Sequence, residues 1–181
     1  CDPAGRFWAG TLSNAGTPGA AALYRLDPDK QVHTMLSGVS NSNGIVWDRS
    51  KTHMYYIDTP TREVAAFDYN DADGSIDNRR TVVRVAKDDG FPDGMCIDTE
   101  DTLWVAHWGG WKVIRYDPSN GAKLEEISVP AAQVTSCAFG GAKLDRLFIT
   151  TAAMGLSEAD LTDQPQAGGL FVCEPGVSGA E

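Results

Sequence analysis

Two residues with metal-binding side chains occupy the same place in two similar segments of the chain. Asn43 begins the segment 43–48 (NGIVWD), and Asp93 begins the segment 93–98 (DGMCID). A carboxamide and a carboxylate directed at one point form a donor set that suits a hard divalent cation. The alternative is that both residues only initiate turns, because Asn-Gly and Asp-Gly are common turn dipeptides. The spacing alone leaves both interpretations open.

The elements that must position these residues recur along the chain. Apolar runs typical of β-strands start at Phe7, Met54, Leu103 and Leu147, at spacings of 47, 49 and 44 residues. A further apolar run follows each of them, in segments 23–27, 64–68, 113–117 and 170–174. A period in the forties that is made only of short strands is typical of β-propeller blades. The repeat therefore predicts an all-β propeller.

The predicted blades also predict where a site lies. In a blade the first strand runs along the central channel and the second returns antiparallel, so the start of one and the end of the other share a face. We expect six polar side chains to rim that face: Asn43, Asp93 and Ser136 at strand starts, and Asp58, His107 and Thr151 at strand ends. His107 is a candidate for substrate contact or proton transfer, or equally for a packed and hydrogen-bonded side chain beside Trp104 and Trp108.

Composition and charge exclude several classes of protein. The chain has 181 residues, 42% hydrophobic and 22% charged, which is enough for a packed core. Its net charge of −10 argues against a nucleic-acid partner, which requires a basic face. No apolar run approaches the roughly 20 residues of a membrane span, so no membrane partner is expected. The four cysteines show no Cys-x-x-Cys spacing, which argues against a zinc knuckle and a thioredoxin-like redox site. Cys96 and Cys173 lie inside apolar strand runs, where a free thiol behaves as a small hydrophobic group, so we expect a reducing, cytoplasmic compartment.

The ends of the chain predict an incomplete ring within a single propeller domain over residues 1–181. Asp2 corresponds to the turn residues Asp48 and Asp98, so the start of its own strand would lie before Cys1. No fourth strand is evident after residue 174. The chain therefore contains about three and a half blades, and the open edges predict further blades on lost sequence or on a companion chain, or self-association.

Two connecting segments have recognisable local signals. Segment 70–74 (NDADG) is acidic, but the EF-hand alignment that puts Gly74 at the sixth position places Tyr69 first and Arg80 twelfth, where carboxylates are needed. A hairpin turn is the better interpretation. In segment 157–161 (SEADL) we expect one helical turn.

The chain resembles the family of regucalcin, gluconolactonase and luciferin-regenerating enzyme. The matching segments follow the family order along the whole chain: 2–11, 42–44, 56–58, 66–69, 78–80, 92–98, 135–141 and 167–171. The resemblance implies a six-bladed β-propeller that binds one divalent cation, Ca²⁺ or Zn²⁺, with Mg²⁺ or Mn²⁺ as other options.

The resemblance also implies roles for individual residues. It makes Asn43 a metal ligand, and it makes Asp93 both a metal ligand and the general base. A third ligand, a glutamate, and an Arg and an Asn that orient the substrate would lie before Cys1. The loop from Thr11 to Ala21 is short and contains no Glu, which departs from regucalcin.

The implied reaction is the hydrolysis of a sugar lactone, in which a divalent cation polarises the carbonyl group and Asp93 activates water. Asp58 and His107 are the candidate substrate contacts on the rim. Two alternatives come from other classes of function: a non-catalytic calcium-binding propeller, and a propeller that binds a partner protein on its channel face.

Overall fold

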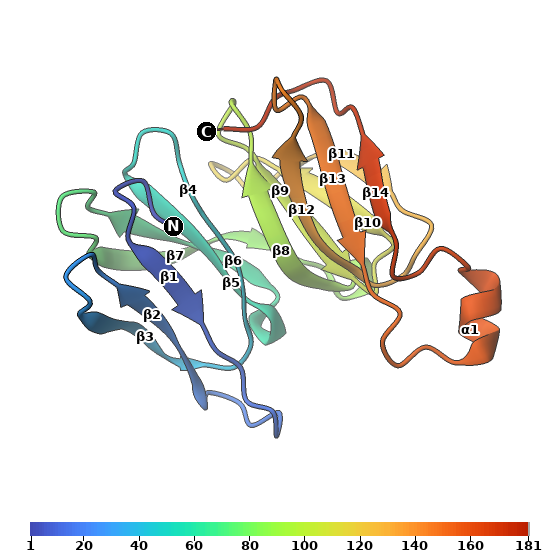
Figure 1. Cartoon of the computed structure of the whole chain (residues 1–181), viewed down its shortest axis with the longest axis horizontal. Helices are drawn as coiled ribbons and strands as arrows, with labels where there is room; N and C mark the ends of the chain where they lie inside the picture. Colours follow the sequence, from blue (N-terminus) through green and yellow to red (C-terminus); the bar gives the residue numbers. More distant parts are fainter. Residues whose placement is uncertain (181) are drawn as a thin grey trace.

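Residues 1–180 are described by a computed structural model, and they form four antiparallel sheets that follow one another along the chain (Figure 1). The first sheet contains β1 (Phe7–Gly10), β2 (Ala21–Leu26) and β3 (Val32–Val39). The second contains β4 (Ser42–Trp47), β5 (His53–Asp58), β6 (Glu63–Tyr69) and β7 (Ile76–Arg84). The third contains β8 (Phe91–Ile97), β9 (Leu103–Trp108), β10 (Lys112–Tyr116) and β11 (Lys123–Ser128). The fourth contains β12 (Val134–Gly140), β13 (Arg146–Thr151) and β14 (Leu170–Cys173).

Within every sheet each strand pairs with the next strand along the chain. The all-β prediction is confirmed, and the fourteen strands of residues 1–180 correspond to three and a half sets of four. Helical structure in this part of the chain is confined to short segments: the 3-10 turns Thr59–Thr61 and Lys87–Asp89, and α1 (Glu158–Asp163). None of the described helices is both long and apolar enough to cross a membrane.

The two local signals are confirmed. A hairpin turn joins β6 to β7, and Gly74 adopts a positive φ of 69° in it. Helix α1 begins after Ser157, whose side chain accepts a hydrogen bond from the Asp160 amide while Asp160 reaches back to the Ser157 amide. This reciprocal capping box satisfies two amide groups that the helix itself leaves unpaired.

The hydrophobic core lies between neighbouring sheets and consists of three clusters. In β5, Met54 and Tyr56 pack toward the first sheet, whereas Tyr55 and Ile57 pack toward the third. The same alternation occurs in β9, where Leu103 packs toward the second sheet and Trp104 packs toward the fourth. Successive side chains of a strand point to opposite faces, so a sheet that is covered on both faces has continuous apolar runs.

A hydrogen-bonded aspartate recurs at the turn that precedes the apolar returning strand. Asp98 accepts hydrogen bonds from the amides of residues 100 and 102, from the Trp104 indole at 2.9 Å and from Arg115 at 2.9 Å. Asp2 accepts the equivalent bonds from the amides of residues 4 and 6 and from the Trp8 indole. The predicted equivalence of these two turn residues is therefore confirmed.

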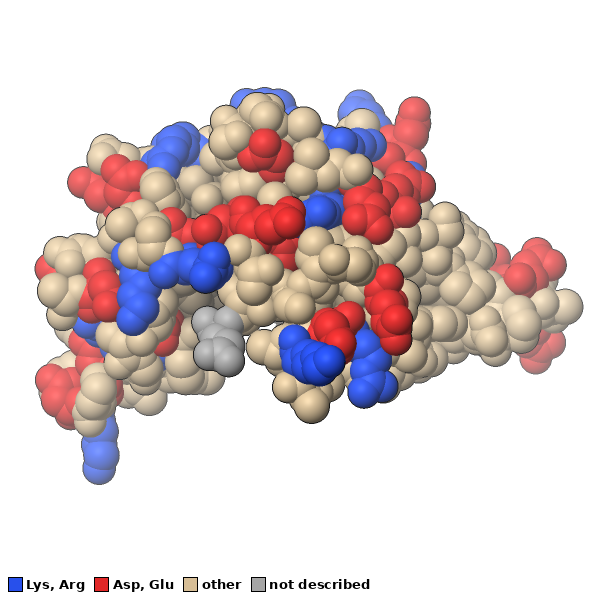
Figure 2. Space-filling view, turned by 90° about the horizontal axis from the view of Figure 1, so that it is seen from above, with Lys and Arg blue, Asp and Glu red and all other residues tan. Residues whose placement is uncertain are grey.

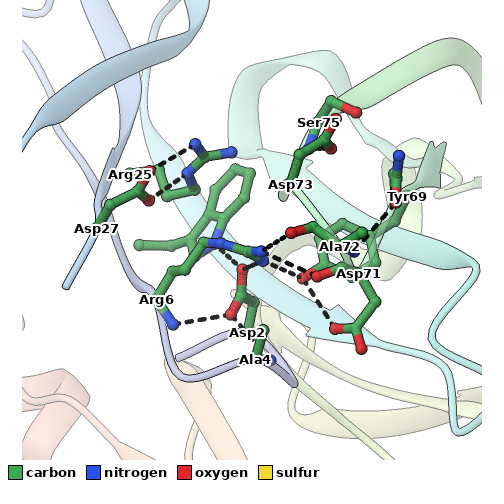
Figure 3. Close-up of polar contacts among 12 residues, drawn as sticks. Asp2, Ala4, Arg6, Arg25, Asp27, Tyr69, Asp71, Ala72, Asp73 and Ser75 are labelled. Carbon is green, nitrogen blue, oxygen red and sulfur yellow. Dashed lines mark hydrogen bonds and ion pairs between the residues drawn. The ribbon is translucent and has the colours of Figure 1, made fainter. Parts of the chain in front are cut away.

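Arg6 joins the first sheet to the second, as Figure 3 shows. Its guanidinium contacts Asp2 at 3.0 Å, donates to the Tyr69 hydroxyl at 3.1 Å, and donates to the carbonyl oxygens of Asp71 and Ala72 at 2.9 Å each. A buried guanidinium is tolerated when its donors are satisfied in this way. The acidic hairpin 70–74 is thereby held against the N-terminal turn.

Charged side chains of both signs share the surface. Figure 2 shows acidic side chains gathered in the middle of one face with basic side chains between them, in keeping with the net charge of −10.

The contacts of Asp98 predict a large loss of stability on its removal. Asp98→Ala leaves the Arg115 guanidinium and the Trp104 indole without their buried acceptor, and breaking a buried ion pair costs about 3–5 kcal/mol of unfolding free energy. Urea unfolding measures this cost. The matched control is Asp117→Ala, because the Asp117 carboxylate caps an exposed turn. Equal losses in the two variants would contradict the structural role of Asp98.

Candidate metal and catalytic site

Asn43 and Asp93 lie inside strands, at equivalent irregularities. The pairing of β4 with β5 shifts register between Ser42 and Ile45, and the pairing of β8 with β9 shifts between Pro92 and Met95. Such bulges re-aim the side chains of the unpaired residues. The interpretation of these residues as turn initiators is therefore wrong, because both lie within strands, and both fall at an equivalent register shift.

Close contact between sheets explains the glycine that follows each of these residues. A Cβ atom on Gly44 would lie 3.0 Å from the Asp93 carbonyl oxygen and 2.7 Å from the Met95 side chain. A Cβ on Gly94 would lie 2.9 Å from the Cα of Ser136 and closer still to its side chain. Neither glycine has a positive φ, so the requirement is space between β4, β8 and β12. This contact brings Asn43 beside Asp93.

Thr59 links Asn43 to the backbone of Pro92, the residue before Asp93. The Asn43 Nδ2 group donates to Thr59 Oγ1 at 2.8 Å, and Thr59 Oγ1 donates to the Pro92 carbonyl at 2.9 Å. Because the threonine proton is used on Pro92, Thr59 can only accept from Asn43, and this fixes which end of the amide faces it. The amide oxygen of Asn43 accepts no hydrogen bond within residues 1–180 and stays available as a ligand.

Thr59 was not among the predicted site residues. Its only signal in the sequence is a hydroxyl directly after Asp58, at the end of a returning strand. Its contact with Pro92 spans 33 residues and depends on how two sheets pack.

The Asp93 carboxyl has a strongly perturbed pKa. Burial raises its pKa to about 6, against hydrogen bonds from the Asn43 side chain and the Gly94 amide that act to lower it. A desolvated carboxylate beside a carboxamide is a poor site for a lone negative charge and a suitable one for a cation.

Asp58 supports the backbone near the site. Its two carboxylate oxygens accept from the amides of Ser40 at 3.0 Å and Asn41 at 2.8 Å, in the connection between β3 and β4. At the end of β13, the Thr151 hydroxyl donates to the Gly169 carbonyl at 2.9 Å. Both strand-end residues thus hold neighbouring backbone.

His107 is fully buried, with an exposed fraction of 0%. Nδ1 contacts the Asp89 carbonyl at 2.8 Å, and Nε2 contacts the Tyr116 hydroxyl at 3.3 Å. Burial lowers the His107 pKa to about 4, against the effect of the bond to Asp89, so the ring is neutral at pH 7. These contacts favour the interpretation of His107 as a packed and hydrogen-bonded side chain.

The donor set fits a hard cation but is small. Within residues 1–180, no group of three or more His, Cys, Asp and Glu side chains is placed to hold a metal. The chain instead offers one carboxylate, Asp93, and one carboxamide oxygen, Asn43, both partly buried. Two oxygen ligands leave positions for water, substrate and further protein donors.

The chain is similar to a family of known proteins. The model of the SMP-30/Gluconolactonase/LRE-like region matches residues 1–153. A protein of Bacillus subtilis (strain 168), provisionally named sugar lactone lactonase YvrE, is 48% identical over 171 residues, which are 94% of this chain and 59% of that protein. Regucalcin of Danio rerio is 47% identical over 181 residues, covering 98% of this chain and 61% of the relative.

A solved structure has the same fold. The calcium-binding protein regucalcin from Agrobacterium tumefaciens superimposes with a TM-score of 0.92 at 28% identity, covering 99% of this chain and 60% of that one. The chain spans about three fifths of the length of these relatives. From the extent of the family match and the identity to these relatives, the chain belongs to the SMP-30/gluconolactonase/LRE-like family.

Proposed function

We propose that the whole protein hydrolyses a sugar lactone at a divalent cation bound by Asn43 and Asp93. The observation that carries the proposal is the pair of equivalent bulges that bring a carboxamide and a desolvated carboxylate together across β4 and β8. Membership of a family with lactonase relatives supports the substrate class.

The residues of the chain divide the chemistry between them. A cation bound here would supply Lewis-acid stabilisation of the carbonyl oxygen as negative charge develops on it. Asp93 is the carboxylate placed to accept the proton of the attacking water. Asn43 provides a ligand oxygen without a second negative charge, and Thr59 holds its amide in that orientation.

The two remaining candidates have more modest roles in this proposal. A substrate contact through Asp58 stays a prediction, because both its oxygens are used on backbone amides. We assign His107 to packing between β9 and β10 rather than to substrate contact.

We propose that the four sheets are blades of one six-bladed propeller domain that includes residues 1–181. Large apolar side chains are exposed on the first and last sheets: Phe7 at 54%, Leu170 at 67% and Val172 at 54%. Further blades, in the same chain or in a second one, or a second copy of this chain, would cover them. In this proposal the third metal ligand, the glutamate that the family resemblance implies, belongs to one of those further blades.

Calcium is the first cation to test, because a structural relative is a calcium-binding protein. Zn²⁺, Mg²⁺ and Mn²⁺ are the other options for the same oxygen ligands. The same relative favours a second candidate function, calcium binding without catalysis. A reducing, cytoplasmic compartment stays a prediction, and all four cysteines are free in the structure.

Removal of the proposed ligands tests the function. In the full-length protein, Asp93→Asn is expected to abolish both lactone hydrolysis and the rise in melting temperature with added Ca²⁺, because the only charged ligand of the described site is lost. Asn43→Ala is expected to weaken the Ca²⁺ effect and reduce hydrolysis. Asp117→Asn, which changes an exposed turn carboxylate, serves as the control.

The outcomes separate the candidate functions. A Ca²⁺ effect that depends on Asp93, without hydrolysis of any aldonolactone, would favour the calcium-binding protein. Failure of all four cations to change the melting temperature would contradict both metal proposals and leave the partner-binding propeller.

Substitutions of Thr59 are expected to lower the affinity for Ca²⁺ to different extents. Thr59→Val removes the acceptor for Asn43 and the donor to Pro92, and loss of a group that orients a ligand typically lowers metal affinity about 10–100-fold. Thr59→Ser keeps the hydroxyl and is expected to retain most of the affinity. Calorimetric titration with Ca²⁺ measures both, and equal affinities in the two variants would show that the hydroxyl does not position Asn43.

Asp93 also predicts a pH dependence of stability in metal-free protein. Because its pKa is raised by folding, the folded state binds more protons than the unfolded state between the ordinary value of 3.8 and about 6. The contribution of Asp93 to stability is present below pH 3.8 and is lost as the pH rises through about 6. In EDTA, wild type is therefore expected to lose stability relative to Asp93→Asn across this window, as measured by urea unfolding. If the unfolding free energy of wild type minus that of Asp93→Asn stayed constant or increased with pH, the result would contradict the raised pKa.

A further inference from the structure

Two cysteines from neighbouring sheets are in contact. Cys96 lies in β8 and Cys137 in β12, 41 residues further along the chain, and their Sγ atoms are 3.7 Å apart. Both are free thiols. The contact is between sheets and not between paired strands, since β8 pairs with β9 and β12 pairs with β13.

The surroundings of the two sulfur atoms are largely apolar. Cys137 is 4% exposed and belongs to the core cluster between the third and fourth sheets, and Cys96 packs against that cluster. The Cys137 thiol donates weakly to the Trp104 carbonyl at 3.3 Å. Contact with Cys137, together with burial, raises the pKa of the Cys96 thiol well above its usual range. The raised pKa leaves little of the Cys96 thiol ionised, so its reaction with an oxidant is slow, and the Cys137 sulfur lies in contact with it.

The pair also lies close to the strand segment that contains Asp93. Cys96 follows Asp93 by three residues in β8, and Cys137 directly follows Ser136, the residue that leaves Gly94 no room for a side chain. A covalent bond between the two sulfur atoms would join the two sheets beside the bulge that places Asp93.

We propose that Cys96 and Cys137 form an intersheet disulfide on reaction with a small peroxide. The bond length of about 2.05 Å requires the sulfur atoms to approach by a further roughly 1.7 Å from their present contact. This modification site does not depend on the proposed lactonase activity.

The chemistry balances in two steps. The small ionised fraction of one thiol attacks hydrogen peroxide, so that a sulfur–oxygen bond forms, the peroxide bond breaks and hydroxide leaves. The second thiol then attacks the resulting sulfenic acid sulfur and displaces its oxygen, which leaves as water. Overall, two thiols are oxidised to one disulfide and one hydrogen peroxide is reduced to two waters.

The disulfide would close a loop that contains the whole of β9, β10 and β11. Cross-linking a loop of this length restricts the unfolded chain, and disulfides of this kind stabilise proteins. We expect the melting temperature to rise by about 5–10 °C on oxidation and to return when dithiothreitol is added.

Peptide mapping of the purified protein is the direct test. The protein is treated with hydrogen peroxide, its remaining thiols are alkylated after denaturation, and the digest is examined by mass spectrometry. A linked pair of peptides containing Cys96 and Cys137 is expected, with a mass 2 Da below the sum of the two thiol peptides. A Cys1→Ser background prevents disulfides between molecules through the exposed Cys1.

Two variants provide the controls. Cys96→Ala is expected to lose the linked peptide and the reversible rise in melting temperature, whereas Cys173→Ala, which removes a partly buried thiol of β14, is expected to keep both. Recovery of Cys96 and Cys137 as alkylated thiols, or as separate sulfinic acids without any linked peptide, would overturn the proposal. The wild-type map decides this even if a variant does not fold.

Discussion

The arrangement of the site depends on the close approach of the innermost strands of three successive sheets. At Gly44 and Gly94 the neighbouring strand lies so near that a single Cβ atom would overlap with it. Protein interiors transmit such steric conflicts because they are close-packed. The sheets reach this separation only because glycine follows Asn43 and Asp93, and the bulge at each position then turns the polar side chain toward the same region.

Asp93 lies near the start of β8 and Asp98 directly follows its end, and the two carboxyl groups have opposite environments. Asp98 is fully buried, yet hydrogen bonds from Thr102, Trp104 and the backbone outweigh the effect of burial and lower its pKa. Asp93 has few such donors, and burial raises its pKa to about 6. The satisfied carboxylate stabilises a turn, and the poorly satisfied one is the group that gains from a cation.

The same logic explains His107. The returning strand β9 is covered on both faces by neighbouring sheets, so its side chains are buried along most of its length. A histidine in such a strand requires partners inside the protein, and the Asp89 carbonyl and the Tyr116 hydroxyl provide them. Position at the end of a predicted strand was therefore not sufficient to place His107 on an open rim.

The sequence by itself determined the strands, the repeat and the equivalence of Asn43 with Asp93, because strand periodicity, turn residues and the spacing of copies are local patterns. It also determined the short helical segment at 157–161 and the recurrence of the turn aspartates at Asp2 and Asp98. Only the tertiary structure decided that the glycines serve close packing and that Thr59 links Asn43 to Pro92. The tertiary structure alone also decided the burial of His107 and the contact between Cys96 and Cys137. Each of these depends on the separation between neighbouring sheets, which is set by the packing of many side chains at once and has no local pattern.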